Sequence, residues 1–486
     1  MKPKHHVWRQ WHEREKPVKI DSTLTNTGLT INVASEELTT SLSIEYPQEV
    51  WEKYHKNNKE KYLENVSYVF TAHLPFLLRG NIRMTYTTGR PTLYTWAQYC
   101  LTKFLPHYWY WTNKQRGTHA FPMLKTMLNS RVSFERTADI PPQFPETLMR
   151  HVVIPFTFGK DSFLTYHIAK EIGLTPTLVY FNEPTEEYSR SHKLALIKQF
   201  TKKTGEVVHF MDNPLGNLRA LGDGWYGWEL ALTSWALLAL PFCSLTKSAY
   251  ILFSNEHDTN DFFYDDDGLR VITHYEQSAE ATEELSILTE SLTEGEVYVS
   301  TFLQPLYDSG IITMLKRKYR TNTFEYLMSC WAENKNAQNK RWCATCSKCA
   351  RLYLLMTAAG IDPMHEAGFE DNMFVTSKRG LYNVFTTDSQ EGGDQYGLNT
   401  NEQALAFYIC WLSGNRSPLV QEYRTTTYFA DVQENFEKYL NKYYCVQEDI
   451  NIPPQWKKRL LTLYERELKA ERKELMKLYT SKNKSM

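Results

Sequence analysis

The sequence predicts an α/β protein built on a doubly wound parallel sheet, preceded by a β-rich unit and followed by a helical region. Three observations favour this fold class. Apolar runs of strand length alternate with helical patterns between residues 149 and 366, a turn containing glycine joins one run to a helix, and four cysteines cluster near the end of that region. The predicted units are therefore residues 1–148, 149–366 and 367–486.

The first unit, residues 1–148, is expected to be an α+β domain rich in strands. Apolar and polar residues alternate from Leu24 to Tyr46, and a charged segment with helical spacing runs from Val50 to Leu63. The stretch from Pro141 to Pro145 indicates a linker into the next unit. The first unit is either a cap that binds substrate or a partner, or a scaffold, and we expect His73 to be exposed on it.

The second unit carries the parallel sheet. Its expected strands are Val152–Phe156, Thr177–Phe181, Glu206–Met211 and Ala249–Ser254, with helices from Ser162 and from Tyr188 to Thr204. Ligands of such sheets bind beyond the carboxyl ends of the strands. This rule puts the turn at 159–162 and the polar residues after the later strands, Asn255 among them, on one rim. Adenine would contact the backbone around Tyr180 and Phe181.

The turn after the first strand has the residue types that bind phosphate. It reads Thr157-Phe158-Gly159-Lys160-Asp161-Ser162, and unpaired N–H groups at a helix start attract anions. Lys160 and the Ser162 hydroxyl lie beside those groups, and Gly159 allows a tight turn. The Walker spacing is missing, which disfavours a kinase-like transfer of the γ-phosphate. An ordinary strand-to-helix turn is the alternative.

The four clustered cysteines have the spacing Cys-x12-Cys-x2-Cys-x2-Cys and are Cys330, Cys343, Cys346 and Cys349. Four thiolates in one short segment indicate a closed tetrahedral zinc site. Because four sulfur ligands leave no position for water, the zinc would be structural. Disulfide pairing is the alternative, although nothing in the sequence indicates secretion.

The turn resembles the Ser-Gly-Gly-x-Asp-Ser loop of the ATP-pyrophosphatase (PP-loop) superfamily, whose fold is that of the adenine nucleotide alpha-hydrolases. Thr157, Gly159, Asp161 and Ser162 match that pattern, and Phe158 departs from it. A Phe is strained wherever φ must be positive, so the loop either takes another path there or binds phosphate less well. Superfamily members attach AMP to a substrate oxygen and release pyrophosphate.

A loop of this kind followed by this cysteine pattern resembles the 7-cyano-7-deazaguanine synthases of the queuosine pathway. Ser329-Cys330, the close from Cys343 to Cys349 and the segment Gln304-Pro305-Leu306 match in order, within residues 150 to 365. The resemblance implies ATP, Mg²⁺ and Zn²⁺ as cofactors. It also implies adenylation of 7-carboxy-7-deazaguanine, followed by amide and nitrile formation.

The sequence departs from those synthases between the loop and the cysteines, where Ser254 to Tyr264 and Thr273 to Glu280 replace the family's substrate segment. The second stretch is similar to segments of an epimerase that adenylates the terminal glutamate of UDP-muramoyl dipeptides. Larger synthase-like proteins also occur in antiphage systems, where a deazaguanine joined to an amine of an acceptor protein is the implied chemistry. A zinc-stabilised nucleotide-binding protein without catalysis is the remaining alternative.

Clustered acidic residues from Glu256 to Asp261, followed by three aspartates at 265–267, favour a Mg²⁺ site beside the loop, a solvated loop being the alternative. The residues expected to act in catalysis are Lys160, Asp161, Ser162 and Glu256. The residues expected to bind ATP are Thr157, Phe158, Gly159, Lys160, Asp161, Ser162, Tyr180, Phe181 and Asn255.

Composition adds little to the function. The 486 residues carry 55 basic and 56 acidic side chains, so no broad field indicates nucleic acid or a membrane surface. The first residues lack the apolar core of a signal peptide, and Leu230 to Leu245 is short and contains Pro241, which predicts a buried helix in a cytoplasmic protein. The charged helix from Trp456 to Thr480 is expected to be a packing or oligomer helix, an RNA-facing basic tail being the alternative.

Overall fold

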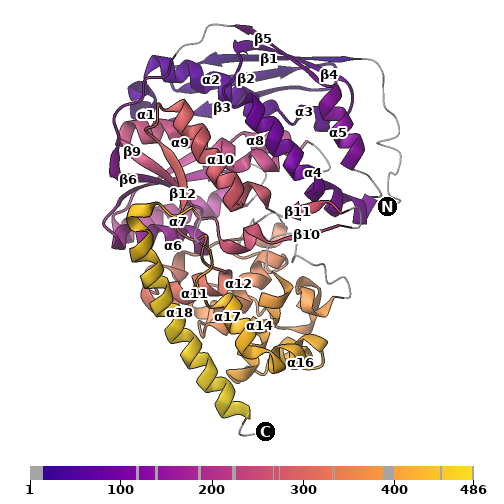
Figure 1. The fold of residues 1–486 in the computed structure, drawn as a ribbon, viewed down its shortest axis with the longest axis vertical. Helices are drawn as coiled ribbons and strands as arrows, with labels where there is room; N and C mark the ends of the chain where they lie inside the picture. Colours follow the sequence, from indigo (N-terminus) through magenta and orange to yellow (C-terminus); the bar gives the residue numbers. More distant parts are fainter. Residues whose placement is uncertain are drawn as a thin grey trace.

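The computed structural model describes residues 15–116, 120–136, 141–183, 188–221, 226–265, 268–272, 274–330, 332, 334–386, 399–448 and 451–483. Its elements form three tiers (Figure 1). A mixed sheet with its helices, from the N-terminal part of the chain, lies at the top of the view, a parallel sheet lies in the middle, and a group of helices from the C-terminal part lies at the bottom.

The middle tier is a five-stranded, fully parallel sheet with the order β12-β9-β6-β7-β8. Its strands are β6 (Leu148–Pro155), β7 (Thr175–Asn182), β8 (Val208–Asp212), β9 (Ser248–Phe253) and β12 (Tyr298–Thr301). The predicted α/β class with a parallel sheet is therefore confirmed. Chain order runs outward in both directions from β6, so the switch point lies between β6 and β9, the place where sheets of this kind bind their ligands.

Both faces of this sheet are buried, and its side chains alternate between two cores. Val152 and Ile154 of β6 join the core shared with the C-terminal helices, whereas Val153 joins the core shared with the N-terminal elements. Burial on both faces explains why the strands read as continuous apolar runs. The helices of this tier are α6 (Lys160–Glu171), α7 (Ser189–Thr204), α8 (Leu215–Arg219), α9 (Ala231–Thr246), α10 (Ala279–Leu292) and α11 (Asp308–Lys318).

Helix α9 is the segment that the sequence marked as apolar. The stretch Trp228–Thr246 has the length and composition of a membrane span, yet most of it is buried inside the protein against β6, β7 and β9. The prediction of a buried helix is confirmed. A short antiparallel pair, β10 (Phe262–Tyr264) and β11 (Arg270–Ile272), follows β9.

The N-terminal tier is a five-stranded mixed sheet with the order β3-β2-β1-β4-β5, which confirms the predicted β-rich start. Its strands are β1 (Lys16–Leu24), β2 (Gly28–Ala34), β3 (Thr39–Glu45), β4 (Ile82–Gly89) and β5 (Arg131–Arg136). Its helices are α1 (Gln48–Lys53), α2 (Lys56–Thr71), α3 (Leu74–Leu78), α4 (Tyr94–Arg116) and α5 (Ala120–Asn129). The segment 141–147 has no regular structure, and the Asn58 amide exchanges two hydrogen bonds of 2.7 Å with the backbone of Gln143.

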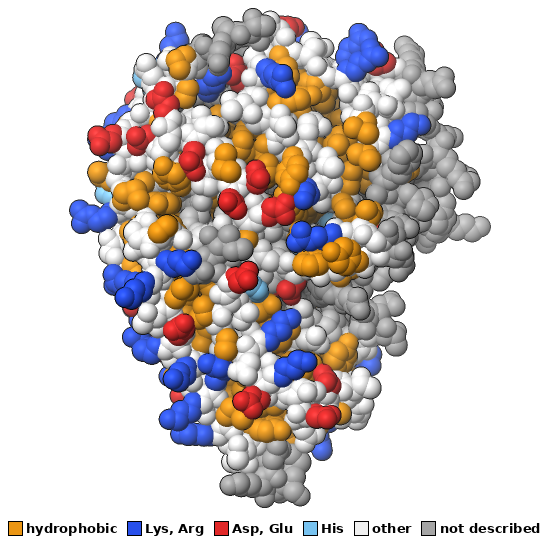
Figure 2. Space-filling view, in the orientation of Figure 1, with side chains coloured by type: hydrophobic (Ala, Val, Ile, Leu, Met, Phe, Trp, Pro, Cys, Tyr) orange, Lys and Arg blue, Asp and Glu red, His pale blue; other side chains and the backbone are white. Residues whose placement is uncertain are grey.

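The C-terminal tier is helical. It consists of α12 (Ser347–Ala358), α13 (Pro363–Glu366), α14 (Thr400–Leu412), α15 (Pro418–Tyr423), α16 (Thr427–Glu434), α17 (Phe436–Tyr443) and α18 (Pro454–Asn483). Helix α18 packs along α11, where Arg317 contacts Glu467 and Glu471 at 3.2 and 3.1 Å. On the face in Figure 2, basic and acidic side chains are interspersed rather than gathered by sign.

Candidate functional site

The loop Thr157–Ser162 connects β6 to α6 at the switch point of the sheet, as the sequence predicts. Its positive φ lies at Phe158 (62°), whereas Gly159 has φ −80° and forms the N-cap of α6. The turn therefore does not use the freedom of Gly159 to take a positive φ, which the sequence offered as its role. A Cβ at position 159 would approach Thr157 Oγ1 at 3.2 Å and Ser329 Oγ at 3.4 Å, so glycine is favoured there by close packing.

Phe158 holds its strained conformation because its ring is buried. Left-handed backbone costs a bulky residue roughly 1–2 kcal/mol. The ring packs on Phe156, Phe163 and Phe200 at centroid distances of 4.8, 5.9 and 5.9 Å. Its carbonyl accepts a hydrogen bond from Met328 N at 2.8 Å. Aromatic burial and this bond offset the strain, so the loop keeps a positive φ at Phe158.

The first turn of α6 offers backbone donors to an anion. Gly159 has no side chain, and no side chain caps the helix start. The Ser162 hydroxyl donates to Gly159 O at 3.1 Å, and Thr157 Oγ1 lies 3.3 Å from Ser162 Oγ. Free N–H groups at a helix start, with the positive end of the helix dipole, are a binding site for phosphate oxygens.

Lys160 does not point into solvent but is held by three carboxylates. Its Nζ lies 2.5 Å from Asp161 Oδ1 and 2.8 Å from Glu256 Oε2, and it also contacts Asp308. Asp161, Glu256 and Asp308 each offer an oxygen within 4.8 Å of the others, a spacing that suits one cation. The predicted residues Lys160, Asp161 and Glu256 thus meet at one point.

Arg351 of α12 reaches the same carboxylates from the opposite side. Its Nη2 lies 2.9 Å from Glu256 Oε1 and 3.7 Å from Asp258 Oδ2, and the guanidinium contacts Asp308. Glu402 of α14 accepts a 2.6 Å hydrogen bond from Ser309 N beside Asp308. We call the set the Lys160 cluster; its members are Lys160, Asp161, Glu256, Asp258, Asp308, Arg351 and Glu402.

Five carboxylates and two basic groups leave the Lys160 cluster with an excess of acid. Burial alone would raise the pKa of Glu256, but Lys160 and Arg351 bring it below its usual range. Burial, and then repulsion by Glu256, raise the pKa of Asp161 and Asp258. Burial and the neighbouring Asp308 raise the pKa of Glu402 to about 8. A bound cation would remove this repulsion.

The remaining predicted nucleotide residues lie near the loop but are buried. Tyr180 and Phe181, in the last part of β7, belong to opposite cores of the sheet. The side-chain amide of Asn255 donates to Thr282 Oγ1 at 3.0 Å, and the backbone carbonyl of Asn255 accepts from Thr301 Oγ1 at 2.9 Å. The side chain of Asn255 therefore braces the loop after β9.

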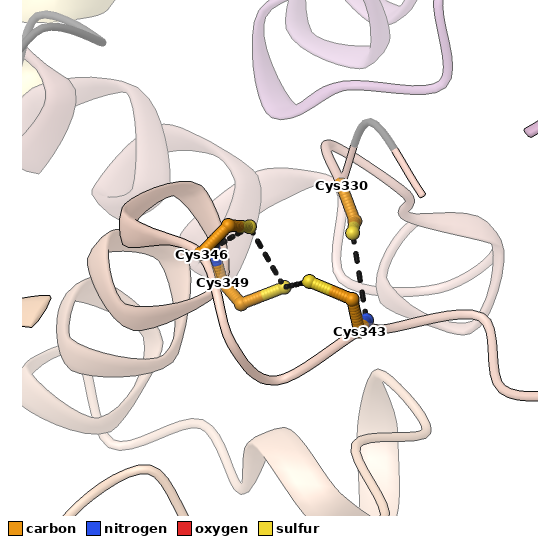
Figure 3. Close-up of side chains that lie close together, drawn as sticks. All are labelled: Cys330, Cys343, Cys346 and Cys349. Carbon is orange, nitrogen blue, oxygen red and sulfur yellow. Dashed lines mark hydrogen bonds between the residues drawn. The ribbon is translucent and has the colours of Figure 1, made fainter. Parts of the chain in front are cut away.

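The four cysteines converge on one point, as Figure 3 shows. We call them the cysteine cluster. Their sulfur atoms all lie within 4.8 Å of one another, with 3.8 Å from Cys343 to Cys349 and 3.5 Å from Cys346 to Cys349. A tetrahedral zinc site with bonds of about 2.3 Å has sulfur–sulfur edges of about 3.8 Å, whereas a disulfide measures about 2.0 Å. The buried group can therefore bind zinc.

Local backbone geometry presents these sulfurs. Thr345 N lies 3.4 Å from Cys343 Sγ, and Ala332 N lies 3.3 Å from Cys330 Sγ, so each sulfur accepts from the residue two positions later. Such bonds stabilise thiolates. All eight cysteines of the chain are free, which makes the disulfide alternative wrong.

The cysteine cluster and the Lys160 cluster share helix α12. Cys346 is the N-cap of this helix, and its sulfur accepts from Cys349 N at 3.4 Å. Cys349 is fully buried, and Arg351 follows it by two residues. The segment that holds the cysteines therefore sets the position from which Arg351 reaches Glu256 and Asp308.

Sequence reasoning did not place Asp308, Arg351 and Glu402 at this site, whereas Asp258 lies in the acidic run that it assigned to a Mg²⁺ site beside the loop. Asp308 stands two residues after the Gln304-Pro305-Leu306 segment, and this was the one local signal available. Of the acidic run after β9, Glu256 and Asp258 turn inward, whereas 266 and 267 lie outside the described residues.

Comparison with protein-family models, with curated proteins and with solved structures found no match for this chain. The chemistry of the site therefore rests on its own groups. A helix start that can bind an anion, a lysine, an arginine and an acid-rich group that suits a cation lie together at the switch point. This set of groups suits a polyphosphate bound with a divalent metal ion.

Proposed function

We propose that the chain is an enzyme of the PP-loop type that uses ATP and Mg²⁺ to adenylate a carboxylate, releasing pyrophosphate and then AMP. The observation that carries the proposal is the convergence of Lys160 with Asp161, Glu256 and Asp308 at the uncapped start of α6. Buried charged groups with shifted pKa values at the start of a helix are typical of catalytic sites, which favours an enzyme over a nucleotide-binding protein without catalysis.

Charge explains why adenylation needs these groups. A carboxylate and the α-phosphate of ATP are both anionic, so they repel one another until positive groups offset their charge. The N–H groups of α6 and the Lys160 ammonium would bind the pyrophosphate part, on which negative charge grows as the bond breaks. No protein nucleophile is needed, and positioning supplies much of the rate.

The residues present fit a magnesium ion. Asp161, Glu256 and Asp308 supply carboxylate oxygens of the kind that Mg²⁺ prefers, and the local excess of acid favours an added cation. When bound, the ion would neutralise phosphate charge. Lys160 contacts the same three carboxylates, so the ammonium and a divalent cation compete for them. Magnesium binding would therefore free Lys160 for the phosphates.

We further propose that the cysteine cluster holds one structural zinc ion. The sulfur spacing and the burial of Cys330, Cys343 and Cys349 support a closed site without a position for water. Its role would be to fix the start of α12, and through it Arg351. Zinc would supply no step of the reaction.

The proposed substrate is 7-carboxy-7-deazaguanine, because the resemblance to 7-cyano-7-deazaguanine synthases rests on both the loop and the cysteines. The acyl-adenylate would pass to an amine, which is ammonia for an amide and then a nitrile, or a group on an acceptor protein. The glutamate of a UDP-muramoyl dipeptide is the second candidate acid.

The test is a reaction of the purified protein with Mg²⁺, ATP and ammonia, with and without 7-carboxy-7-deazaguanine, followed by AMP and pyrophosphate assays and by mass spectrometry of every product. We expect AMP only when the acid is present. A parallel reaction with the muramoyl dipeptide separates the two acids. ADP in place of AMP, or no nucleotide product with either acid, would contradict the proposal.

A further inference from the structure

A second group of buried polar side chains lies at the same edge of the sheet, beside the loop. It comprises His73 at the N-cap of α3, Glu183 after β7, Asn213 after β8 and Arg219 of α8, and we call it the Arg219 group. All four side chains are buried. Three belong to the parallel sheet's carboxyl edge, and His73 comes from the N-terminal tier. The group therefore lies where the two tiers meet.

Arg219 is only partly satisfied by its neighbours. Its Nη2 contacts Glu183 Oε2, and its guanidinium lies over the Trp228 ring at 4.7 Å. Its Nε and Nη1 are buried and have no hydrogen-bond partner. Glu183, by contrast, also accepts from Asn213 Nδ2 at 2.7 Å. The carboxylate is therefore satisfied, whereas two nitrogens of the guanidinium still lack acceptors.

The His73 ring is also buried without hydrogen-bond partners, and it lies against Gly227, next to the Trp228 ring over which Arg219 lies. Its side chain is fully buried, which makes the expectation of an exposed His73 wrong, and neither Nδ1 nor Nε2 has a partner. The ring lies against the backbone of Gly227, where a Cβ would come within 2.8 Å of it. Gly227 has φ 98°, so glycine meets both the backbone and the packing requirement. Burial, and then the positive charge of Arg219, lower the pKa of His73, so the guanidinium lies close enough to act on the ring electrostatically.

Unpartnered buried donors are rare in folded proteins, because each costs about 1–3 kcal/mol. Here two nitrogens of the Arg219 guanidinium and both nitrogens of the neutral His73 ring, one of which carries a proton, lack partners together. The neighbouring Asn213, in contrast, is fixed by hydrogen bonds to Glu183, to Ser234 and to the backbone N–H of Leu215. Only hydrogen-bond partners for Arg219 and His73 are missing. A ligand with an oxygen acceptor would supply them.

We propose that Arg219 and His73 bind a carbonyl or carboxylate oxygen on the non-reacting end of the acid substrate. This inference rests on the proposed function for the identity of that acid. Strand β7, which leads into Glu183, is hydrogen-bonded beside β6, which leads into the loop, and neighbouring strands are roughly 5 Å apart. One small molecule can therefore span from the Arg219 group to the loop.

The chemistry of the group limits the ligand. Because Glu183 already balances the charge of Arg219, the site accepts a neutral carbonyl as well as a carboxylate. The 6-oxo group of 7-carboxy-7-deazaguanine and the second carboxylate of a glutamate both supply the acceptor. An amino group in the same place would bring donors against donors. The site would therefore select acids that carry a hydrogen-bond acceptor at the end opposite the reacting carboxylate.

The test measures binding by titration calorimetry with three probes: 7-carboxy-7-deazaguanine, its 2,6-diamino analogue, in which an amino group replaces the oxo group, and a UDP-muramoyl dipeptide. We expect one of the two oxo-bearing acids to bind and the diamino analogue to bind at least about 10-fold more weakly. The His73→Gln and Arg219→Gln variants should each lose at least about 10-fold in affinity. Arg190→Gln, at an exposed arginine, is the matched control and should bind as the original protein does.

The two variants distinguish a loss of binding from a loss of folding. Arg219→Gln leaves Glu183 without its cation and can destabilise the protein, whereas His73→Gln removes no charge and keeps a side chain that hydrogen-bonds. Binding that is unchanged in folded His73→Gln, equal binding of the oxo and amino probes, or no binding of either acid would each overturn the inference. Binding that depends on His73, without AMP formation, would support this site and contradict the proposed reaction.

Discussion

The cysteine cluster and the Lys160 cluster are built in opposite ways. The cysteine cluster comes from one segment, Cys330 to Cys349, in which backbone turns alone bring four sulfurs within 4.8 Å. The Lys160 cluster draws on five elements spread from residue 160 to residue 402, brought together by the switch point of the sheet and by three later helices. Local chain geometry makes the first, and tertiary folding makes the second.

The difference also concerns charge. In the proposed account, one zinc ion satisfies every ligand of the cysteine cluster at once. The Lys160 cluster holds five carboxylates against two basic groups and stays short of positive charge, which suits a site that binds and releases a charged substrate. The first cluster should therefore govern stability, and the second should govern activity.

Removal of a cysteine ligand should have the largest effect. Cys349→Ser breaks a closed site whose metal contributes on the order of 10 kcal/mol to folding in zinc-dependent domains. We expect loss of zinc together with a marked fall in melting temperature. Metal analysis and thermal unfolding check this, with Cys445→Ser, at a lone cysteine, as the control. A zinc-free Cys349→Ser protein with unchanged stability would refute the structural role.

Arg351→Gln should come next, because it leaves buried Asp308 and Glu256 without one of their cations. Loss of one partner from a buried ion pair costs about 3–5 kcal/mol. Urea unfolding should show a decrease of this size, while zinc content stays the same. Arg379→Gln, at a half-exposed pair with Glu422, should cost less than about 1 kcal/mol. Loss of zinc from Arg351→Gln would mean that the two clusters are not separable.

Asp161→Asn should change activity and leave stability intact. Burial, and then repulsion by Glu256, raise the pKa of Asp161, so a neutral amide removes an unfavourable charge. Loss of a carboxylate at the cation site should lower AMP formation by at least about 100-fold, or about 2.7 kcal/mol. The melting temperature should not fall. Asp371→Asn, at a surface pair with Lys340, serves as the control. Full activity in Asp161→Asn would remove the loop from the mechanism.

The smallest expected effect depends on pH. Burial and the nearby Arg219 lower the pKa of His73 to about 3, from 6.5 in an unfolded chain. Below pH 6.5 the unfolded chain takes up a proton that the folded chain does not, so stability is lost as the pH falls towards 3. At pH 5 the loss is about 2 kcal/mol. Urea unfolding of His73→Gln should lack this share of the loss; an identical pH profile would show that His73 is not buried as a neutral ring.

The sequence predicted what is local and missed what is distant. Strand, turn and helix between Val152 and Glu171 follow from an apolar run, a glycine and helical spacing, and the four cysteines follow from their spacing alone. Asp308, Arg351 and Glu402 carry no local pattern, because their roles depend on where α11, α12 and α14 pack. β12 is short and was likewise not expected.

Single residues show the same limit. The composition of the loop identified a strained position at Phe158, but only the packing of its ring on Phe156 and Phe163 explains how the strain is tolerated. His73 looked exposed because polar residues usually are, whereas the chain buries it against Gly227. Burial of a polar side chain is decided by tertiary contacts, which no local window contains.

The account's central claim is that the Lys160 cluster serves transfer of AMP to a carboxylate. The most direct measurement uses 7-carboxy-7-deazaguanine with ¹⁸O in its carboxyl group, together with Mg²⁺, ATP and ammonia, and weighs the AMP produced. Attack by a carboxylate oxygen on the α-phosphate, followed by amide formation, leaves that oxygen on AMP, so the account predicts AMP heavier by one ¹⁸O. AMP without the label, or label in phosphate or pyrophosphate, would contradict it.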